Sequence, residues 1–116
     1  MMEIVNESMG QTLSKDAELR DSFWGRFRGL MLSKKKDIVL AAKEDSVVDS
    51  TIHMMFMLYP IDVVWVSKDM RVVEVREDVK PSVWRMHKPK APAKYVIELA
   101  VGEVKDTKEG DTIKFK

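Results

Sequence analysis

The side chains of this sequence that are best suited to ligand binding or acid–base chemistry gather in one apolar stretch. Residues 50–66, STIHMMFMLYPIDVVWV, contain His53, Tyr59 and Asp62 among methionines and branched aliphatic residues. An imidazole and a phenol in an apolar wall are typical of a pocket for a small ligand, and Met57 falls on the same face of the predicted strand as both. The same residues also fit a hydrophobic core, in which methionine fills gaps and the histidine is hydrogen-bonded.

Two carboxylates stand on predicted strands between apolar neighbours. Asp62 lies in IDVVWV and Glu98 lies in YVIELAV, where the residues two positions away are apolar. A buried carboxylate must be protonated, or find hydrogen-bond donors, or pair with a cation. We therefore expect Asp62 to accept hydrogen bonds from backbone N–H groups or to pair with Arg28 or Arg85, and Glu98 to be a structural or paired charge. Alternatively, either carboxylate could act with His53 as acid or base.

The composition excludes several kinds of metal site. The chain has no cysteine and only two histidines, which excludes disulfides, thiolate sites and a three-histidine zinc site. A Cu(I) site of thioethers and imidazoles would draw its ligands from His53, Met55, Met57, Met86 and His87. Because no established metal-ligand motif accompanies these residues, we predict a protein without a metal or another cofactor.

Residues 77–94 include a concentrated basic segment. Positions 80–94, KPSVWRMHKPKAPAK, contain five Lys or Arg residues, three prolines and no acidic residue. Proline opposes helices and removes a donor from a sheet, so residues 77–94 are predicted to form a long irregular loop, and such loops are often lids or binding loops. We expect Trp84 and Arg85 to lean toward the strand bearing His53, where the indole ring would be buried and the guanidinium would lie near Asp62 or an anionic group of a ligand.

One helix and a set of strands would position these side chains. From Ser14 onward, SKDAELRDSFWGRFRGLML places apolar residues at helical spacing and acids in the first turn, which predicts an N-terminal helix that ends near Gly29. Short β-rich runs follow at 37–42, 47–59, 62–66, 71–76, 95–101 and 112–115, with turns at SKDM and KEGD. The sequence therefore predicts an α+β fold, mostly β, with a small curled sheet or partly closed β-barrel and one N-terminal helix.

Length and composition bear on domain organisation and location. A chain of 116 residues can bury a core of its own, so we expect residues 1–116 to form a single domain. The most apolar run is interrupted by polar residues and is shorter than the ~20 residues of a membrane span, and no secretory signal is recognisable, so we expect a cytoplasmic protein. The charged fraction of 34% exceeds the usual ~25%, which favours a thermostable protein.

Five segments of the chain form an ordered set: RGLM at 28–31, IHMMFMLYPIDVVWV at 52–66, DMRVVEV at 69–75, WR at 84–85 and VIELAVG at 96–102. Together they resemble domain-of-unknown-function family 192, an uncharacterised protein family. The resemblance implies a small standalone β-rich domain without an established activity. The positions that match the family pattern are Arg28, Gly29, Leu30, Met31, His53, Phe56, Met57, Pro60, Asp62, Trp84, Arg85, Glu98, Leu99 and Gly102. Leu58 stands where the family often has a basic residue, which argues against an anion-binding role at that position.

Three functions follow from these features. The one we favour is a binding module for a small ligand or partner, with a pocket near His53 that residues 77–94 cover. The second is a hydrolase-like enzyme that uses Asp62 or Glu98 with His53, although no recognised catalytic motif supports it. The third is nucleic-acid binding through the basic segment, for which five positive charges and one aromatic residue are a small footprint. We expect no membrane partner, and the oligomeric state does not follow from the sequence.

Overall fold

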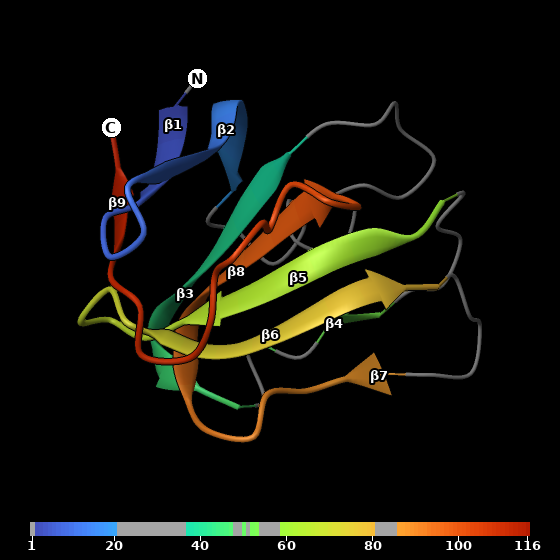
Figure 1. Ribbon diagram of the computed structural model, residues 1–116. Coiled ribbons are helices and arrows are strands. Elements are labelled where there is room, and N and C mark those ends of the chain that lie inside the picture. The colour runs from blue at the N-terminus through green and yellow to red at the C-terminus, as the bar shows by residue number, and fades with distance from the viewer. Residues whose placement is uncertain (1, 21–36, 48–49, 51, 54–58, 81–85) are drawn as a thin grey trace.

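The computed structural model describes residues 2–20, 37–47, 50, 52–53, 59–80 and 86–116. Within these ranges every regular element is a β-strand (Figure 1). The strands are β1 (Met2–Asn6), β2 (Gln11–Arg20), β3 (Ile38–Ser46), β4 (Ile52–His53), β5 (Ile61–Val66), β6 (Val72–Val79), β7 (Met86–His87), β8 (Ala93–Ala100) and β9 (Ile113–Phe115).

Seven of the strands form one sheet in the order β6-β5-β8-β3-β2-β1-β9. Neighbouring strands are antiparallel except β2 and β3, which are parallel. The two shortest strands, β4 and β7, pair with each other in a separate antiparallel ribbon, which we call the β4–β7 ribbon. Figure 1 shows this ribbon on the side of β6, away from the two chain ends at β1 and β9.

The sheet curls until its two edge strands meet at one end. An isolated bridge joins Arg71, just before β6, to Thr112, just before β9. The amide of Val72 donates to the carbonyl of Asp111 at 2.8 Å, which ties the same two edges together. The architecture is therefore a β half-barrel, closed at the β6–β9 end.

The curl gives the sheet an inner and an outer face, and both are apolar along β5 and β8. The inner-face core draws on β1, β2, β3, β5, β6, β8 and β9, and includes Ile4, Leu13, Val39, Val64, Ile97 and Ile113. The outer-face core is confined to β3, β5, β6 and β8, and includes Ile38, Leu40, Ile61, Val63, Trp65 and Val96. Every residue of β5 is buried, because its alternating side chains enter the two cores in turn.

The prediction of an α+β fold with an N-terminal helix was wrong, because the described chain is all β. Residues 14–20, the start of the expected helix, belong to β2, and the remainder of that expected helix lies outside the described residues. β2 pairs with β1 on one side and β3 on the other, so its backbone groups are satisfied by distant segments. Leu13 and Ala17 are buried while Leu19 is 53% exposed, so Leu19, the described member of the apolar residues at helical spacing, does not lie on the buried face. Sheet pairing outweighed a weak local preference.

The strands predicted at 37–42, 62–66, 71–76, 95–101 and 112–115 coincide with β3, β5, β6, β8 and β9. The predicted turns are also present: Met70 donates to the carbonyl of Ser67 at 2.9 Å in SKDM, and Gly110 has a φ of 88° in KEGD. The predicted irregular loop at 77–94 was too long, since β6 runs to Val79, β7 lies at 86–87 and β8 begins at Ala93. Of the strand expected at 47–59, the described part contains only β4. Over the described ranges, no helix is long and apolar enough to cross a membrane.

Candidate functional site

The residues predicted to frame a ligand site are only partly described. Met57, Trp84 and Arg85 lie outside the described residues, as does Arg28, which with Arg85 was a predicted partner of Asp62. For His53 the backbone alone is described. It belongs to β4, where Ile52 pairs with His87 and His53 pairs with Met86. The backbone of the basic segment therefore runs beside the strand that carries His53, while the predicted positions of the Trp84 and Arg85 side chains stay predictions.

Arg76 fastens the β4–β7 ribbon to the outer face of the sheet. Its Nη2 donates to the carbonyl of Lys88 at 2.7 Å, and its Nη1 lies 3.4 Å from Nδ1 of His87. The guanidinium carbon is 5.1 Å from the centroid of the Trp65 ring, which is a cation–π arrangement. One side chain on β6 thus contacts both the ribbon and the apolar wall beneath it.

Glu74 orients this arginine. Its Oε2 accepts from Nε of Arg76 at 2.5 Å, and its Oε1 accepts from the backbone amide of Lys90 at 2.8 Å. In the β5–β6 register Glu74 is opposite Trp65 and Arg76 is opposite Val63, so all four residues share the outer face. The carboxylate therefore holds the guanidinium over Trp65 and also anchors the chain after β7.

The segment before β4 contacts the same wall. Trp65 is fully buried, and its Nε1 donates to the carbonyl of Ser50 at 2.8 Å. Tyr59, one of the predicted ligand-binding residues, is partly buried and packs against the outer-face core. The outer face beneath the β4–β7 ribbon consequently combines an apolar wall with a phenol, an indole and a guanidinium.

Asp62 is buried on the inner face and is held by two backbone amides. It is 1% exposed, its Oδ1 accepts from Asp78 at 2.9 Å and its Oδ2 accepts from Gly102 at 2.8 Å. Asp78 has a φ of 53° in the β-bulge of β6 opposite Ile61, and Gly102 has a φ of 96° in the turn after β8. We call this arrangement the Asp62 clasp, because one carboxylate joins a bulge to a turn. It satisfies the expectation that Asp62 accepts backbone N–H groups.

Asp62 and Glu98 lie on opposite faces of the sheet. Glu98 is opposite Val63 and is therefore on the outer face, whereas Asp62 is opposite Leu99 and is on the inner face. Glu98 is also buried, at 5% exposure, and it takes part in an interaction of its own. The sheet separates the two carboxylates, so they do not form a common acid–base pair.

Asp37 and Glu103 form a carboxyl pair near the Asp62 clasp, at the end of β8. Ala100 donates its amide to Oδ1 of Asp37 at 3.3 Å and accepts from the amide of Glu103 at 3.0 Å. Burial, a hydrogen bond with Asp37 and the negative charges of Asp37 and Asp62 raise the pKa of Glu103 from 4.5 to about 7, against the opposing charge of Lys105. Glu103 therefore changes its charge near neutral pH. Neither Asp37 nor Glu103 was singled out from the sequence, where both stand among ordinary surface charges.

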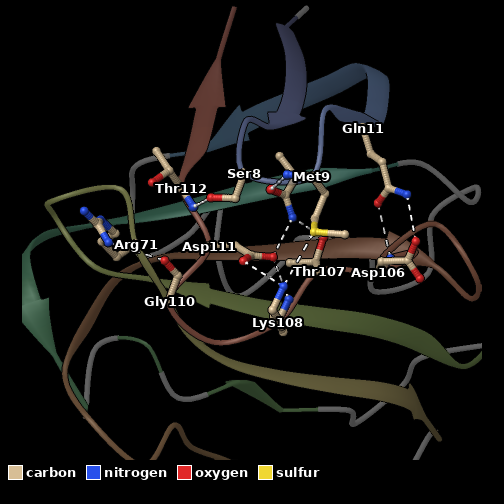
Figure 2. Close-up of polar contacts among 11 residues, drawn as sticks. Ser8, Met9, Gln11, Arg71, Asp106, Thr107, Lys108, Gly110, Asp111 and Thr112 are labelled. Carbon is tan, nitrogen blue, oxygen red and sulfur yellow. Dashed lines mark hydrogen bonds and ion pairs between the residues drawn. The ribbon is translucent and has the colours of Figure 1, made fainter.

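A polar network at the closed end of the half-barrel joins the β1–β2 turn to the chain before β9 (Figure 2). The buried amide of Asn6 donates from Nδ2 to Oγ1 of Thr107 and to Oδ2 of Asp111, both at 3.0 Å. Burial opposes ionisation of Asp111, but hydrogen bonds from Asn6 and Lys108 and the charge of Lys108 lower its pKa below 3.8. Nearby, Gln11 bonds Asp106 at 2.9 Å. These contacts stabilise the closure of the sheet.

The residues proposed for a copper site are His53, Met55, Met57, Met86 and His87. Among its five residues the described side chain is that of His87, whose Nδ1 faces Arg76. Within the described residues, no group of three or more His, Cys, Asp or Glu side chains is arranged to hold a metal ion.

Comparison with known proteins identifies the family. The profile of domain-of-unknown-function family 192 (DUF192), described as an uncharacterized ACR, matches residues 4–115. This chain belongs to the DUF192 family. A UPF0127 protein of Thermococcus kodakarensis is 39% identical over 114 residues, which are 95% of this chain and 71% of the relative. A UPF0127 protein of Pyrococcus horikoshii is 37% identical over 115 residues, which are 97% of each chain. The resemblance inferred from the five segments is confirmed.

Two crystal structures share the fold of this DUF192 chain. A Sinorhizobium meliloti protein, whose name proposes a transcription regulator, has a TM-score of 0.84 and 22% identity over 98% of this chain and 91% of its own. A Novosphingobium aromaticivorans protein of unknown function has a TM-score of 0.82 and 18% identity over 97% of this chain and 82% of its own. At these identities the likeness is one of fold alone, so a function for this DUF192 chain must come from its own side chains.

Proposed function

We propose that this DUF192 chain is a binding module that takes a small ligand on the outer face of the sheet, next to the β4–β7 ribbon and His53. The observation that carries the proposal is the attachment of the ribbon. It stands apart from the seven-stranded sheet, and Arg76 contacts it through Lys88 and His87. Short elements outside the main sheet are among those that open locally, and lids over binding sites are drawn from such elements.

The chemistry of the outer face supports a ligand with an apolar body and a polar group. Ile61, Val63 and Trp65 contribute a buried apolar wall, and Tyr59 packs at its margin. Glu98 lies on this face as well, so a carboxylate, a phenol and a guanidinium surround the wall. Pockets for small molecules combine such a wall with a few polar groups that fix orientation.

A thermal-shift screen tests the proposal. The parent protein and the variants His53→Gln, Tyr59→Phe and Lys114→Gln are melted at pH 7.5 with and without a panel of small molecules that carry an apolar body and a polar group. Lys114 is exposed on β9, which Figure 1 shows away from the β4–β7 ribbon, so its variant is the matched control. A compound at a hundred times its Kd adds about 2.7 kcal/mol to the stability of the folded state. We expect a stabilising compound to act on the parent and on Lys114→Gln, and to lose its effect in the other two variants.

Two results would overturn this proposal: no compound raises the melting temperature, or a stabilising compound acts equally on His53→Gln.

The hydrolase alternative would gain support if Glu98→Gln abolished turnover of a stabilising compound. Asp62 is a poor choice of base because the clasp occupies both of its oxygens. The nucleic-acid alternative would require retention on a nucleic-acid column that falls steeply as salt is raised.

A further inference from the structure

The contact between Arg76 and His87 defines the protonation state of the histidine. A guanidinium has five N–H donors, no acceptor, and does not lose its proton in proteins. A hydrogen bond over the 3.4 Å from Nη1 of Arg76 to Nδ1 of His87 requires Nδ1 to be the acceptor. An imidazole that accepts this bond is neutral, with its proton on Nε2.

A second proton on His87 would reverse this contact. The imidazolium carries N–H groups on both nitrogens, so Nδ1 would present a donor to a donor and a cation to a cation. Among the described side chains, the charged and titratable groups near His87 are Arg76 and Glu74 on β6 and Lys88 and Lys90 in the chain after β7. Glu74 is already held by Nε of Arg76 and the amide of Lys90, so it keeps the guanidinium facing the imidazole.

The consequence falls on the β4–β7 ribbon, because His87 is one of the two residues of β7. Its backbone pairs with Ile52, and its side chain is one of two attachments of Arg76 to this part of the chain. The other attachment, to the carbonyl of Lys88, is unaffected by protonation. Protonation of His87 would thus remove the contact of Arg76 with Nδ1 and place two cations against each other, while the bond from Arg76 to the carbonyl of Lys88 would remain.

We propose that His87 is a proton-sensitive latch, which holds the β4–β7 ribbon on the sheet while the imidazole is neutral and loosens it when the imidazole gains a second proton. The released form binds one more proton than the closed form, so closure is favoured at high pH and is lost as pH falls through the titration of the imidazole. The latch itself depends only on the Arg76–His87 contact. Its use to regulate entry to the ligand site rests on the proposed function.

Amide hydrogen exchange and imidazole nitrogen NMR test the latch on the full chain without any ligand. At pH 8 the nitrogen spectrum of His87 should show the Nε2–H tautomer. From pH 8 to pH 5, exchange at Ile52, His53, Met86 and His87, corrected for the intrinsic pH dependence, should accelerate about tenfold or more, as expected for losing a hydrogen bond to a charged group. Amides in the centre of β5 and β8 should show no comparable acceleration.

Two variants separate the latch from general acid effects. His87→Asn keeps an acceptor close to the position of Nδ1 but does not titrate, so its ribbon should stay protected at pH 5. Arg76→Gln removes the cation that opposes protonation, so its ribbon should exchange at similar corrected rates at pH 5 and pH 8. An Nδ1–H tautomer at pH 8, or an acid-induced loss of protection that persists in His87→Asn, would overturn the latch.

The two proposals fail separately. Thermal shifts are measured at the single pH of 7.5 and hydrogen exchange is measured without ligand, so equal protection at pH 5 and pH 8 would reject the latch and leave the ligand site standing. If instead the ribbon loosens in acid but no compound stabilises the protein, the latch stands and the ligand site is rejected. If both hold, the affinity for the stabilising compound should change between pH 8 and pH 5 in the parent and should change far less in His87→Asn.

Discussion

Removing the Asp62 carboxylate is the most direct perturbation of the fold around the candidate site. Asp62→Ala deprives the amides of Asp78 and Gly102 of their acceptor, at 2.9 and 2.8 Å. Each hydrogen bond to a charged group contributes ~1.5–3 kcal/mol, which sums to about 3–6 kcal/mol for the pair. Part of this loss is offset because the variant no longer buries a charge. We therefore expect Asp62→Ala to lower the free energy of unfolding by about 2–4 kcal/mol.

Asp62→Asn separates charge from shape. The asparagine retains one oxygen, but its NH2 group would face the second backbone N–H as donor against donor. We expect a loss between zero and that of Asp62→Ala, of about 1.5–3 kcal/mol. The assay is urea unfolding at pH 7.5, with the midpoint and slope fitted for each variant. The control is Asp106→Ala, whose exposed carboxylate bonds Gln11 at 2.9 Å and whose removal should change stability by no more than about 0.5 kcal/mol.

A loss below about 1 kcal/mol in Asp62→Ala, with Asp62→Asn indistinguishable from the parent, would refute the clasp, because two buried charge-assisted bonds cannot be removed at that cost. In that case the buried carboxylate at position 62 would need another explanation, and its use in acid–base chemistry would regain support. A large loss would confirm that the residue is structural.

Three further predictions follow. Asn6→Ala should cost about 2–4 kcal/mol by urea unfolding, because Asp111 and Thr107 both lose a buried donor, and a smaller loss than from an exposed control such as Lys114→Ala would contradict this. The pKa of Glu103 is raised to about 7 in the folded state, so its stabilising contribution is complete below pH 4.5 and is lost as pH rises through about 7. The unfolding free energy of Glu103→Gln should therefore increase relative to that of the parent from pH 5 to pH 8. A constant difference between the two proteins would contradict this. Trp65→Phe should cost about 2–4 kcal/mol, since it leaves the carbonyl of Ser50 without its 2.8 Å donor and opens a cavity in the outer-face core, whereas a neutral effect would mean that the core closes around the smaller ring.

The sequence alone determined the strands in which apolar residues occupy both faces. β5 and β8 were recognisable because β-branched and aliphatic residues occupy both alternating positions, and such strands are stable only when both faces are buried. The two carboxylates in these strands were also recognisable, because Asp62 and Glu98 interrupt apolar faces, and the need of Asp62 for hydrogen-bond donors or a cation followed from the cost of a buried charge. The positive φ of Gly110 followed from the turn residues around it.

Tertiary structure decided everything that depends on partners distant in the chain. Residues 14–20 became part of a strand because β1 and β3 satisfy their backbone, and the parallel pairing with β3 does not follow from a local pattern. The register of β5 against β8 placed Asp62 and Glu98 on opposite faces, since adjacent positions of a strand alternate in direction. The contact of Arg76 with His87 is of the same kind, because the two residues lie 11 positions apart in the chain and only the packing of β6 against the β4–β7 ribbon brings the guanidinium to the imidazole.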